Sequence, residues 1–195
     1  MDIEQVIQCE RINVVGTSGS GKSTFGRQLA ELLNLPFYEI DAIYWKPNWQ
    51  QASDHELIEG VAKMTSQDRW VLDGNYSKTL PDKWRRVQLV VWLDLPFART
   101  VCRVTCRTVR RIIARDEIWP GTGNCESFGK SFLSPDSVIW WAITTHRKNR
   151  KAYRDLMASS DYSHVEFVRL RSPRSVAKFL AELRRALGHS HQANS

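Results

Sequence analysis

Short apolar runs alternate with longer amphipathic stretches along this chain of 195 residues. The runs predict five β-strands, at residues 12–15, 35–41, 70–76, 89–96 and 165–170. The stretches between them predict helices, at residues 22–33, 53–66, 97–115, 137–158 and 172–183. Strands that alternate with helices are typical of a parallel sheet with helices on both faces, so the pattern predicts an α/β fold.

Three details of the pattern make the prediction more specific. The run at residues 89–96 is almost continuously apolar, as expected of a central strand that is buried on both faces. Ser53 and Glu56 have the spacing of a capping box, which favours a helix that begins there. In the helix at residues 137–158, we expect the first half, with Trp140 and Trp141, to be buried and the second half to form a basic surface.

Length and cysteine content indicate one domain in a reducing compartment. A chain of this size buries roughly 70% of its unfolded surface, so a single core suffices without disulfides or metals. No C-x-x-C pair occurs among the four cysteines, Cys9, Cys102, Cys106 and Cys125. The first residues are acidic where a signal peptide would be basic, and no apolar run is long enough to span a membrane. We expect a cytoplasmic protein with one domain at residues 1–188 and a frayed tail at 189–195.

The net charge of +7 is concentrated in one segment. Residues 97–155 hold 12 Lys and Arg against 5 Asp and Glu, whereas the rest of the chain holds 16 of each. Such a basic segment suits a nucleic acid, but a site that closes around a triphosphate also needs cations. Charge alone leaves both interpretations open.

The stretch from Gly16 to Thr24 has the pattern G-x-x-x-x-G-K-[ST] and lies between a predicted strand and a predicted helix. In this context the glycines let backbone N–H groups surround phosphate oxygens at a helix N-terminus, whereas a plain Gly/Ser-rich turn is the alternative. Lys22 would reach the terminal phosphates and the Ser23 hydroxyl would bind Mg²⁺. The motif predicts ATP and Mg²⁺ as ligands, with the nucleotide held by Gly16, Ser18, Gly19, Ser20, Gly21, Lys22, Ser23 and Thr24.

Two acidic residues end predicted strands, where parallel α/β sheets bind their ligands. Asp73 has the position of a carboxylate that holds Mg²⁺ together with Ser23. Asp41 could meet Mg²⁺ or an acceptor hydroxyl, or it could form an Asx turn or a helix cap. Asn75 and Tyr76 follow Asp73 and lie either at the same site or in an ordinary turn.

Two further segments could complete a site. Residues 42–49 contain Tyr44, Trp45 and Trp49, which suit the wall of an acceptor pocket or a loop that packs on its own core. Residues 115–136 interrupt the helical pattern with polar residues, prolines and glycines. This segment is either a small mobile lid or a surface loop.

Taken over nearly the whole chain, these motifs resemble the adenylate-kinase-like P-loop kinases. The resemblance rests on residues 16–24, on Val71–Gly74 and on Leu93–Pro96. It implies a three-layer P-loop NTPase fold with a five-stranded parallel sheet, strand order 2-3-1-4-5, helices on both faces and a small lid. It also implies that Arg103 stacks on adenine and Arg107 contacts phosphate, and that the helix after the lid turns Arg147, Arg150 and Arg154 toward the transferred group.

The chain departs from adenylate kinases after Asp73, where Gly74-Asn75-Tyr76-Ser77 replaces their Gly-Phe-Pro-Arg. AMP is therefore not the expected acceptor. These residues, with Asp41 and the aromatic residues at 44–49, resemble the subfamily of DNA topology modulation (FlaR-type) proteins. Related shikimate and gluconate kinases use an acid after their second strand against a hydroxyl acceptor, a role that Asp41 could fill.

Two functions are consistent with this sequence. The first is a small-molecule kinase that moves the γ-phosphoryl group of ATP to a hydroxyl or phosphate acceptor, with the catalytic residues Lys22, Asp41, Asp73, Arg107, Arg147 and Arg150. The second is a nucleotide-switched regulator whose basic segment binds DNA or RNA. A GTPase is disfavoured because Asn-Lys-x-Asp and Thr-Lys-x-Asp are absent. No motif in the sequence specifies the acceptor.

Overall fold

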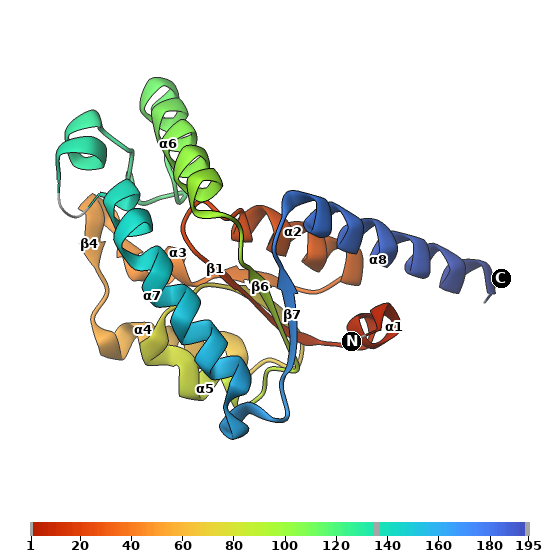
Figure 1. Ribbon diagram of the computed structural model, residues 1–195. Coiled ribbons are helices and arrows are strands. Elements are labelled where there is room, and N and C mark those ends of the chain that lie inside the picture. The colour runs from red at the N-terminus through yellow and green to blue at the C-terminus, as the bar shows by residue number, and fades with distance from the viewer. Residues whose placement is uncertain (1, 135–136, 194–195) are drawn as a thin grey trace.

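A five-stranded parallel sheet organises the computed structural model, which describes residues 2–134 and 137–193 (Figure 1). Its strand order is β2-β5-β1-β6-β7, which in chain order of the predicted strands is 2-3-1-4-5. The predicted fold class and topology are thus confirmed. In sheet order the strands are Phe37–Glu39 (β2), Trp70–Asp73 (β5), Arg11–Gly16 (β1), Leu89–Leu93 (β6) and Glu166–Leu170 (β7).

The five predicted helices are present, and the structure adds several short elements. The long helices are Lys22–Leu33 (α2), Asp54–Thr65 (α4), Phe97–Ala114 (α6), Val138–Ala158 (α7) and Pro173–Ala193 (α8). The short helices Ile3–Ile7 (α1) and Leu80–Trp84 (α5) were not among the predicted elements. Residues 45–51 form a small antiparallel hairpin, with strands Trp45–Lys46 (β3) and Gln50–Gln51 (β4) on either side of a 3-10 turn. The predicted capping box of Ser53 and Glu56 opens α4.

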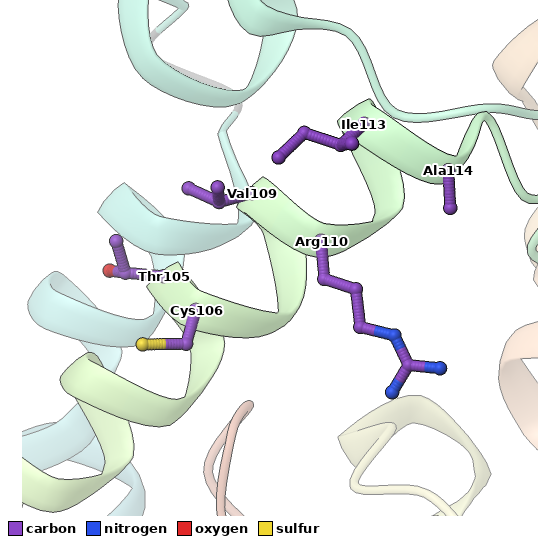
Figure 2. A pocket seen from close by; sticks show the side chains of 6 residues that line it. All are labelled: Thr105, Cys106, Val109, Arg110, Ile113 and Ala114. Atoms are coloured by element: carbon purple, nitrogen blue, oxygen red, sulfur yellow. The ribbon is translucent and has the colours of Figure 1, made fainter.

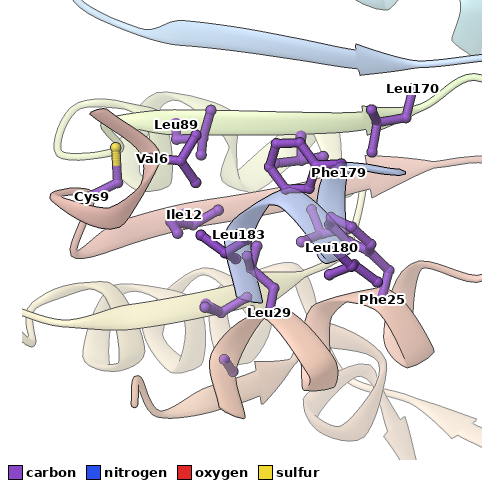
Figure 3. Packing of buried hydrophobic residues seen from close by; sticks show 14 of the residues in the cluster. Val6, Cys9, Ile12, Phe25, Leu29, Leu89, Leu170, Phe179, Leu180 and Leu183 are labelled. Carbon is purple, nitrogen blue, oxygen red and sulfur yellow. The ribbon is translucent and has the colours of Figure 1, made fainter. Parts of the chain in front are cut away.

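One face of the sheet is covered by α1, α2 and α8. Residues that alternate along the strands, such as Ile12 and Leu89, point to this face and pack against Phe25, Leu29 and Leu183 of the helices (Figure 3). All five side chains are at least 98% buried. This packing fixes α2, and with it the phosphate-binding loop, to the sheet.

The other face carries the short helix Ile40–Tyr44 (α3) together with α4, α5 and α7. The intervening strand residues, among them Val15 and Trp92, pack here with Leu57 of α4, Trp84 of α5 and Tyr153 of α7. Residues of β6 are buried on both sides, as its continuous apolar run predicts. The result is a three-layer domain with its functional loops at the carboxyl ends of the strands.

The predicted second strand ends earlier than expected. Pairing with β5 stops at Glu39, and Ile40–Tyr44 forms a short helix (α3). Ile40, Ile43 and Tyr44 have the i, i+3, i+4 spacing of a helix face. They pack with the buried side chains on the face of the sheet that carries α4, α5 and α7. Asp41 therefore lies in the first turn of a helix, and the prediction that it ends a strand is wrong.

The expected burial of the first half of α7 is also wrong. Trp140 and Trp141 are 53% and 62% exposed, whereas Tyr153 in the second half is buried against Trp92. The first half of α7 extends beyond the sheet toward α6 and the lid, so it has no sheet to cover (Figure 1).

An outward face of α6 is exposed as well. Its side chains include Thr105, Val109 and Ile113, the last of them 77% exposed (Figure 2). Cys102 and Cys106 are exposed on the same helix. At the other end of the chain, α8 continues to Ala193, past Gly188, where we expected a frayed tail to begin. Within the described ranges, every helix is too short or too polar to cross a bilayer.

Candidate active site

The phosphate-binding loop fits closely against α6. Gly19 and Gly21 have φ angles of 83° and 91°, a region that favours glycine. A Cβ on Gly19 would overlap the carbonyl oxygen of Thr100, and one on Gly21 would lie 2.9 Å from Nη2 of Arg103. Gly19 is therefore required both by the turn and by the proximity of α6, whereas Gly21 is required mainly by its positive φ, because the Arg103 side chain could move aside.

The N-terminus of α2 is open to an anion. Gly21 caps this helix without any side-chain hydrogen bond. Lys22 lies over the loop, and its Nζ donates to the carbonyl oxygen of Thr17 at 3.4 Å. Oγ of Ser20 is buried and has no hydrogen-bond partner. Free helix N–H groups, a lysine and an unsatisfied hydroxyl suit a phosphate group.

Ser23 and Asp73 meet at the carboxyl end of the sheet. Oγ of Ser23 donates to Oδ2 of Asp73 at 2.5 Å, while Oδ1 of Asp73 is buried without a hydrogen-bond partner. Burial raises the pKa of Asp73 to about 6, although Lys22 and the Ser23 hydrogen bond act in the opposite direction. A divalent cation would satisfy the free oxygen and favour the ionised carboxylate, so these residues fit Mg²⁺.

Metal binding here would depend on the nucleotide. In the described part of the chain, no three His, Cys, Asp or Glu side chains gather in a ready-made metal site. Ser23 and Asp73 supply only two protein groups, so the remaining ligands would be phosphate oxygens and water. This is the manner in which Mg²⁺ is commonly held at phosphate sites.

Residues 73–76, which we call the rim segment, connect three parts of the site. Asp73 receives the Ser23 hydrogen bond. Oδ1 of Asn75 accepts from the N–H of Gly16 at 3.0 Å, and Nδ2 of Asn75 donates to the Gly16 carbonyl oxygen. The hydroxyl of Tyr76 donates to Oδ1 of Asp41 at 2.7 Å. Asn75 and Tyr76 therefore belong to the site and not to an ordinary turn.

Asp41 and Arg107 face the same region from different elements. Burial and the neighbouring guanidinium of Arg111 lower the pKa of Arg107, whereas the carboxylates of Glu126 and Asp41 act to raise it. Glu126 belongs to the lid and pairs with Arg111 at 3.2 Å. An acid from α3, arginines from α6 and an acid from the lid are thus close enough to influence one another electrostatically.

A cavity of about 220 Å³ opens beside the phosphate-binding loop. Arg103 forms part of its wall, next to Gly21 and Thr24. The opposite wall is apolar, with Leu95 of the loop after β6 and Val176 of α8. Arg103 thus lies beside the phosphate-binding loop, and its contact with the nucleotide base stays a prediction.

The arginines of α7 have different surroundings. Nε of Arg150 lies 3.0 Å from Oδ1 of Asp94, and the same buried carboxylate binds Arg169 at 2.5 Å. Arg147, one turn earlier, is exposed to solvent. Arg150 is therefore engaged by Asp94 in this structure, while Arg147 is accessible to a ligand.

Trp45 and Trp49 pack on the lid, whereas Tyr44 packs against Tyr76, with ring centroids 4.9 Å apart. The rings of Trp45 and Trp119 stack with centroids 6.4 Å apart, and Trp49 meets both rings edge-on. Asn124 adds two hydrogen bonds, donating to the Lys46 carbonyl oxygen at 2.9 Å and accepting from the Trp49 N–H at 2.8 Å. The hairpin is thus bound to the lid, a contact that the sequence did not predict. Tyr44 packs on the core, and a role of these aromatic residues in an acceptor pocket stays a prediction. Of the predicted lid, Pro135 and Asp136 lie outside the described residues.

A buried polar network beneath the rim segment was not predicted. It consists of Asn13, Lys83 and Trp84, all fully buried. Pro81 favours the start of a helix, which could have revealed α5. No sequence pattern marks a lysine as buried, because lysine is ordinarily exposed.

The strand order, the loop after β1 and the acid at the end of β5 give this chain the fold of the P-loop kinases. A family model described as shikimate kinase matches residues 18–54. A shikimate kinase of Prochlorococcus marinus (strain NATL2A) is 30% identical over 114 residues, which cover 51% of this chain and 58% of that protein. Shikimate kinase 1 of Enterobacter sp. (strain 638) is 38% identical over 77 residues, covering 39% of this chain and 35% of that protein. The chain thus spans less than two thirds of either relative.

Solved structures agree in fold over nearly the full chain. Shikimate kinase from Acinetobacter baumannii, in complex with shikimate, superposes with a TM-score of 0.55 at 16% identity, covering 96% of this chain and 98% of that one. Shikimate kinase from Aquifex aeolicus gives 0.52 at 17% identity, covering 93% and 98%. A gluconokinase from Sinorhizobium meliloti 1021 gives 0.50 at 17% identity, covering 94% of both chains. None of these proteins supports the resemblance to the topology modulation subfamily.

Proposed function

We propose that this chain is a small-molecule P-loop kinase that transfers the γ-phosphoryl group of ATP to a hydroxyl group. The observation that carries the proposal is the rim segment, which joins the Ser23–Asp73 pair on the nucleotide side to Asp41 on the acceptor side. A nucleotide-switched regulator would need only the Ser23–Asp73 pair. A hydroxyl acceptor requires in addition a positioned acid, and Asp41 is such an acid.

ATP would bind with its phosphates in the loop after β1 and its base in the cavity beside Arg103. Lys22 would hold the terminal phosphates, and Ser23 with Asp73 would hold Mg²⁺. When bound, Mg²⁺ neutralises negative charge on the β- and γ-phosphates. The protein's own part is to position the groups and to exclude water, which is most of what phosphoryl transfer demands of an enzyme.

Asp41 is the acceptor-side residue of this proposal. The acceptor hydroxyl oxygen would form a bond to the γ-phosphorus as the bond from that phosphorus to the leaving ADP oxygen breaks, and Asp41 would take the hydroxyl proton. The Tyr76 hydroxyl fixes one carboxylate oxygen at 2.7 Å and leaves the other for the acceptor. Arg107, on the same side, would neutralise charge on the transferred group.

Arg147 and Arg150 have separate proposed roles. Arg147 is accessible and could contact the transferred group once substrates are bound. Arg150 would first have to release its ion pair with Asp94. Asp94 would then keep its ion pair with Arg169.

Shikimate and sugar acids are the first acceptors to test, because the matching relatives and structures are described as shikimate kinases and a gluconokinase. The experiment measures ADP release by purified protein with MgATP and each of shikimate, gluconate, nucleosides and simple sugars, against an acceptor-free background. We expect acceptor-stimulated turnover with one of them, and none for Lys22→Ala. No stimulation by any acceptor, together with ATP-switched DNA binding at physiological salt, would contradict the proposal.

A further inference from the structure

Lys83 is a fully buried lysine beneath the rim segment. Its Nζ donates to the carbonyl oxygens of Gly74 at 3.3 Å and of Tyr76 at 3.4 Å. Across the described ranges it forms no ion pair with a carboxylate. An ammonium group in such surroundings normally costs several kcal/mol unless it is compensated.

Asn13 and Trp84 complete the buried polar network around Lys83. Nε1 of Trp84 donates to Oδ1 of Asn13 at 2.8 Å, and Nδ2 of Asn13 donates to the carbonyl oxygens of Leu72 at 2.8 Å and Gly74 at 3.4 Å. The Gly74 carbonyl thus receives both Asn13 and Lys83. The backbone between Asp73 and Tyr76 thus accepts hydrogen bonds from β1 and α5. The Tyr76 carbonyl oxygen also accepts from the N–H of Thr79 at 3.2 Å and from its hydroxyl at 2.8 Å.

Stability does not account for a lysine at this position. Burial lowers the pKa of Lys83 to about 7, with the carboxylate of Asp73 acting in the opposite direction. Replacing buried charges by apolar residues of similar volume is often neutral or stabilising. A methionine would fill the same space in the core, so the gain from lysine must lie in the groups that it holds.

We propose that Lys83 is a positioning residue of the nucleotide site, which fixes the carbonyl groups of Gly74 and Tyr76 and so holds the rim segment in place. Two carbonyls two residues apart, bound to one donor, set the peptide planes that direct Asp73 toward Ser23 and Asn75 toward Gly16. The inference rests on the proposed function, because it assumes that MgATP and MgADP bind here.

The test compares two lysines from the stretch of chain that follows the rim segment. Lys83→Met removes the buried ammonium and keeps the volume. Lys78→Met is the matched control, because Lys78 is exposed and its ion pair with Asp54, at 2.6 Å, lies on the surface. For wild type and both variants, MgADP affinity is measured by calorimetry and the melting temperature by scanning calorimetry.

We expect Lys83→Met to bind MgADP about 10 to 100 times more weakly, the usual effect of losing a group that orients a ligand-binding residue. Its melting temperature should be unchanged or higher, as is common when an apolar side chain replaces a buried charge. The loss of MgADP affinity without a loss of stability is the result that a merely structural lysine would not give. Lys78→Met should match wild type in both measurements. In the combined variant Lys83→Met/Asn75→Ala, the fold-loss of MgADP affinity should be smaller than the product of the fold-losses in the two single variants. The reason is that both substitutions act through the rim segment.

Wild-type affinity in Lys83→Met, or a lower melting temperature with unchanged affinity, would overturn the inference. If Lys83→Met does not fold, Lys83→Gln replaces it, because its amide retains a donor without the charge. Failure of both variants to fold would make Lys83 a residue of the core and would also overturn the inference. Absence of MgADP binding by wild-type protein is a different result, because it contradicts the proposed function itself.

Discussion

The side-chain amide of Asn75 hydrogen-bonds to both backbone groups of Gly16, the first glycine of the phosphate-binding loop. The N–H of Gly16 donates to Oδ1 at 3.0 Å, and the carbonyl oxygen accepts from Nδ2. The two residues are 59 positions apart in the chain. The loop is therefore held by the adjacent strand as well as by its own glycines.

Asn75→Ala should weaken MgADP binding by about ten-fold while the protein remains folded. The change removes two partly buried hydrogen bonds, each of which contributes about 1 kcal/mol. Asn75→Asp should weaken binding further, because a carboxylate can accept from the Gly16 N–H but repels its carbonyl oxygen and the phosphates. Calorimetric titration with MgADP measures both variants, and wild-type affinity in Asn75→Ala would show that the contact is incidental.

Gly19→Ala should disrupt the loop, and Gly121→Ala serves as its control. Both glycines have positive φ, at 83° and 84°, so alanine causes similar backbone strain of about 1 kcal/mol at either position. Only at Gly19 would the new Cβ meet neighbouring atoms, whereas nothing lies within 4 Å at Gly121. The melting temperature and the affinity for MgADP should both decrease more in Gly19→Ala than in Gly121→Ala. Equal effects would mean that α6 can move away from the loop at little cost.

Asp41→Asn and Asp73→Asn should have separable effects. Asp73→Asn should raise the Mg²⁺ concentration needed for nucleotide binding, because its carboxylate has the free oxygen beside Ser23. Asp41→Asn should reduce acceptor-stimulated turnover by roughly 10²- to 10⁴-fold, the range for loss of a general base, and leave MgADP affinity nearly normal. Identical profiles of the two variants against Mg²⁺ and acceptor would contradict this division of roles.

Arg103→Ala should weaken nucleotide binding, while Arg110→Ala should not. Arg103 lies beside Gly21 in the wall of the cavity, whereas Arg110 is exposed on α6 and does not line that cavity. We expect turnover at low ATP to fall by a factor of roughly ten to a thousand for Arg103→Ala, as for loss of a charged contact in such a site. If both variants instead lose affinity for duplex DNA equally, with no change in MgADP binding, the arginines of α6 serve a nucleic acid.

Stability should rise between pH 7 and about 9 because of Lys83. The folded pKa of Lys83 is about 7 and the unfolded value is 10.5, so in this range only the unfolded chain binds the proton. The free energy of unfolding then increases by at most about 1.4 kcal/mol per pH unit. Asp73 has the opposite sign, since its pKa rises from 3.8 to about 6 on folding, and its effect falls below this range. Urea denaturation of wild type and Lys83→Met at several pH values tests this, and equal slopes would contradict it.

Local patterns predicted the nucleotide side of the site well. The loop motif, the strand before it and the acid ending β5 each depend on a few consecutive residues, and the parallel sheet then places them together. The prediction that Asp41 ends a strand failed because the stretch Phe37–Asp41 is too short to distinguish the two-residue period of a strand from the 3.6-residue period of a helix. Lys83 was overlooked because charge ordinarily indicates exposure.

Burial of the tryptophans in α7 could not be inferred from composition. Whether Trp140 and Trp141 cover the sheet depends on where α7 leaves it, and this is decided by the length of the lid and by the contact with α6. The bond between Asn75 and Gly16 is also non-local. It arises because β5 and β1 are neighbours in the sheet, a relation that the sequence of neither strand specifies.

The contact between Asn124 of the lid and the backbone of Lys46 and Trp49 has a practical consequence for protein engineering. Two segments about seventy residues apart share one stack of indole rings and one buried amide. A chimaera that takes only the lid from another kinase would leave Trp45 and Trp49 without their stacking partner and two backbone groups unsatisfied. Residues 45–51 and the lid therefore form a single exchangeable module, to be transplanted, shuffled or randomised together.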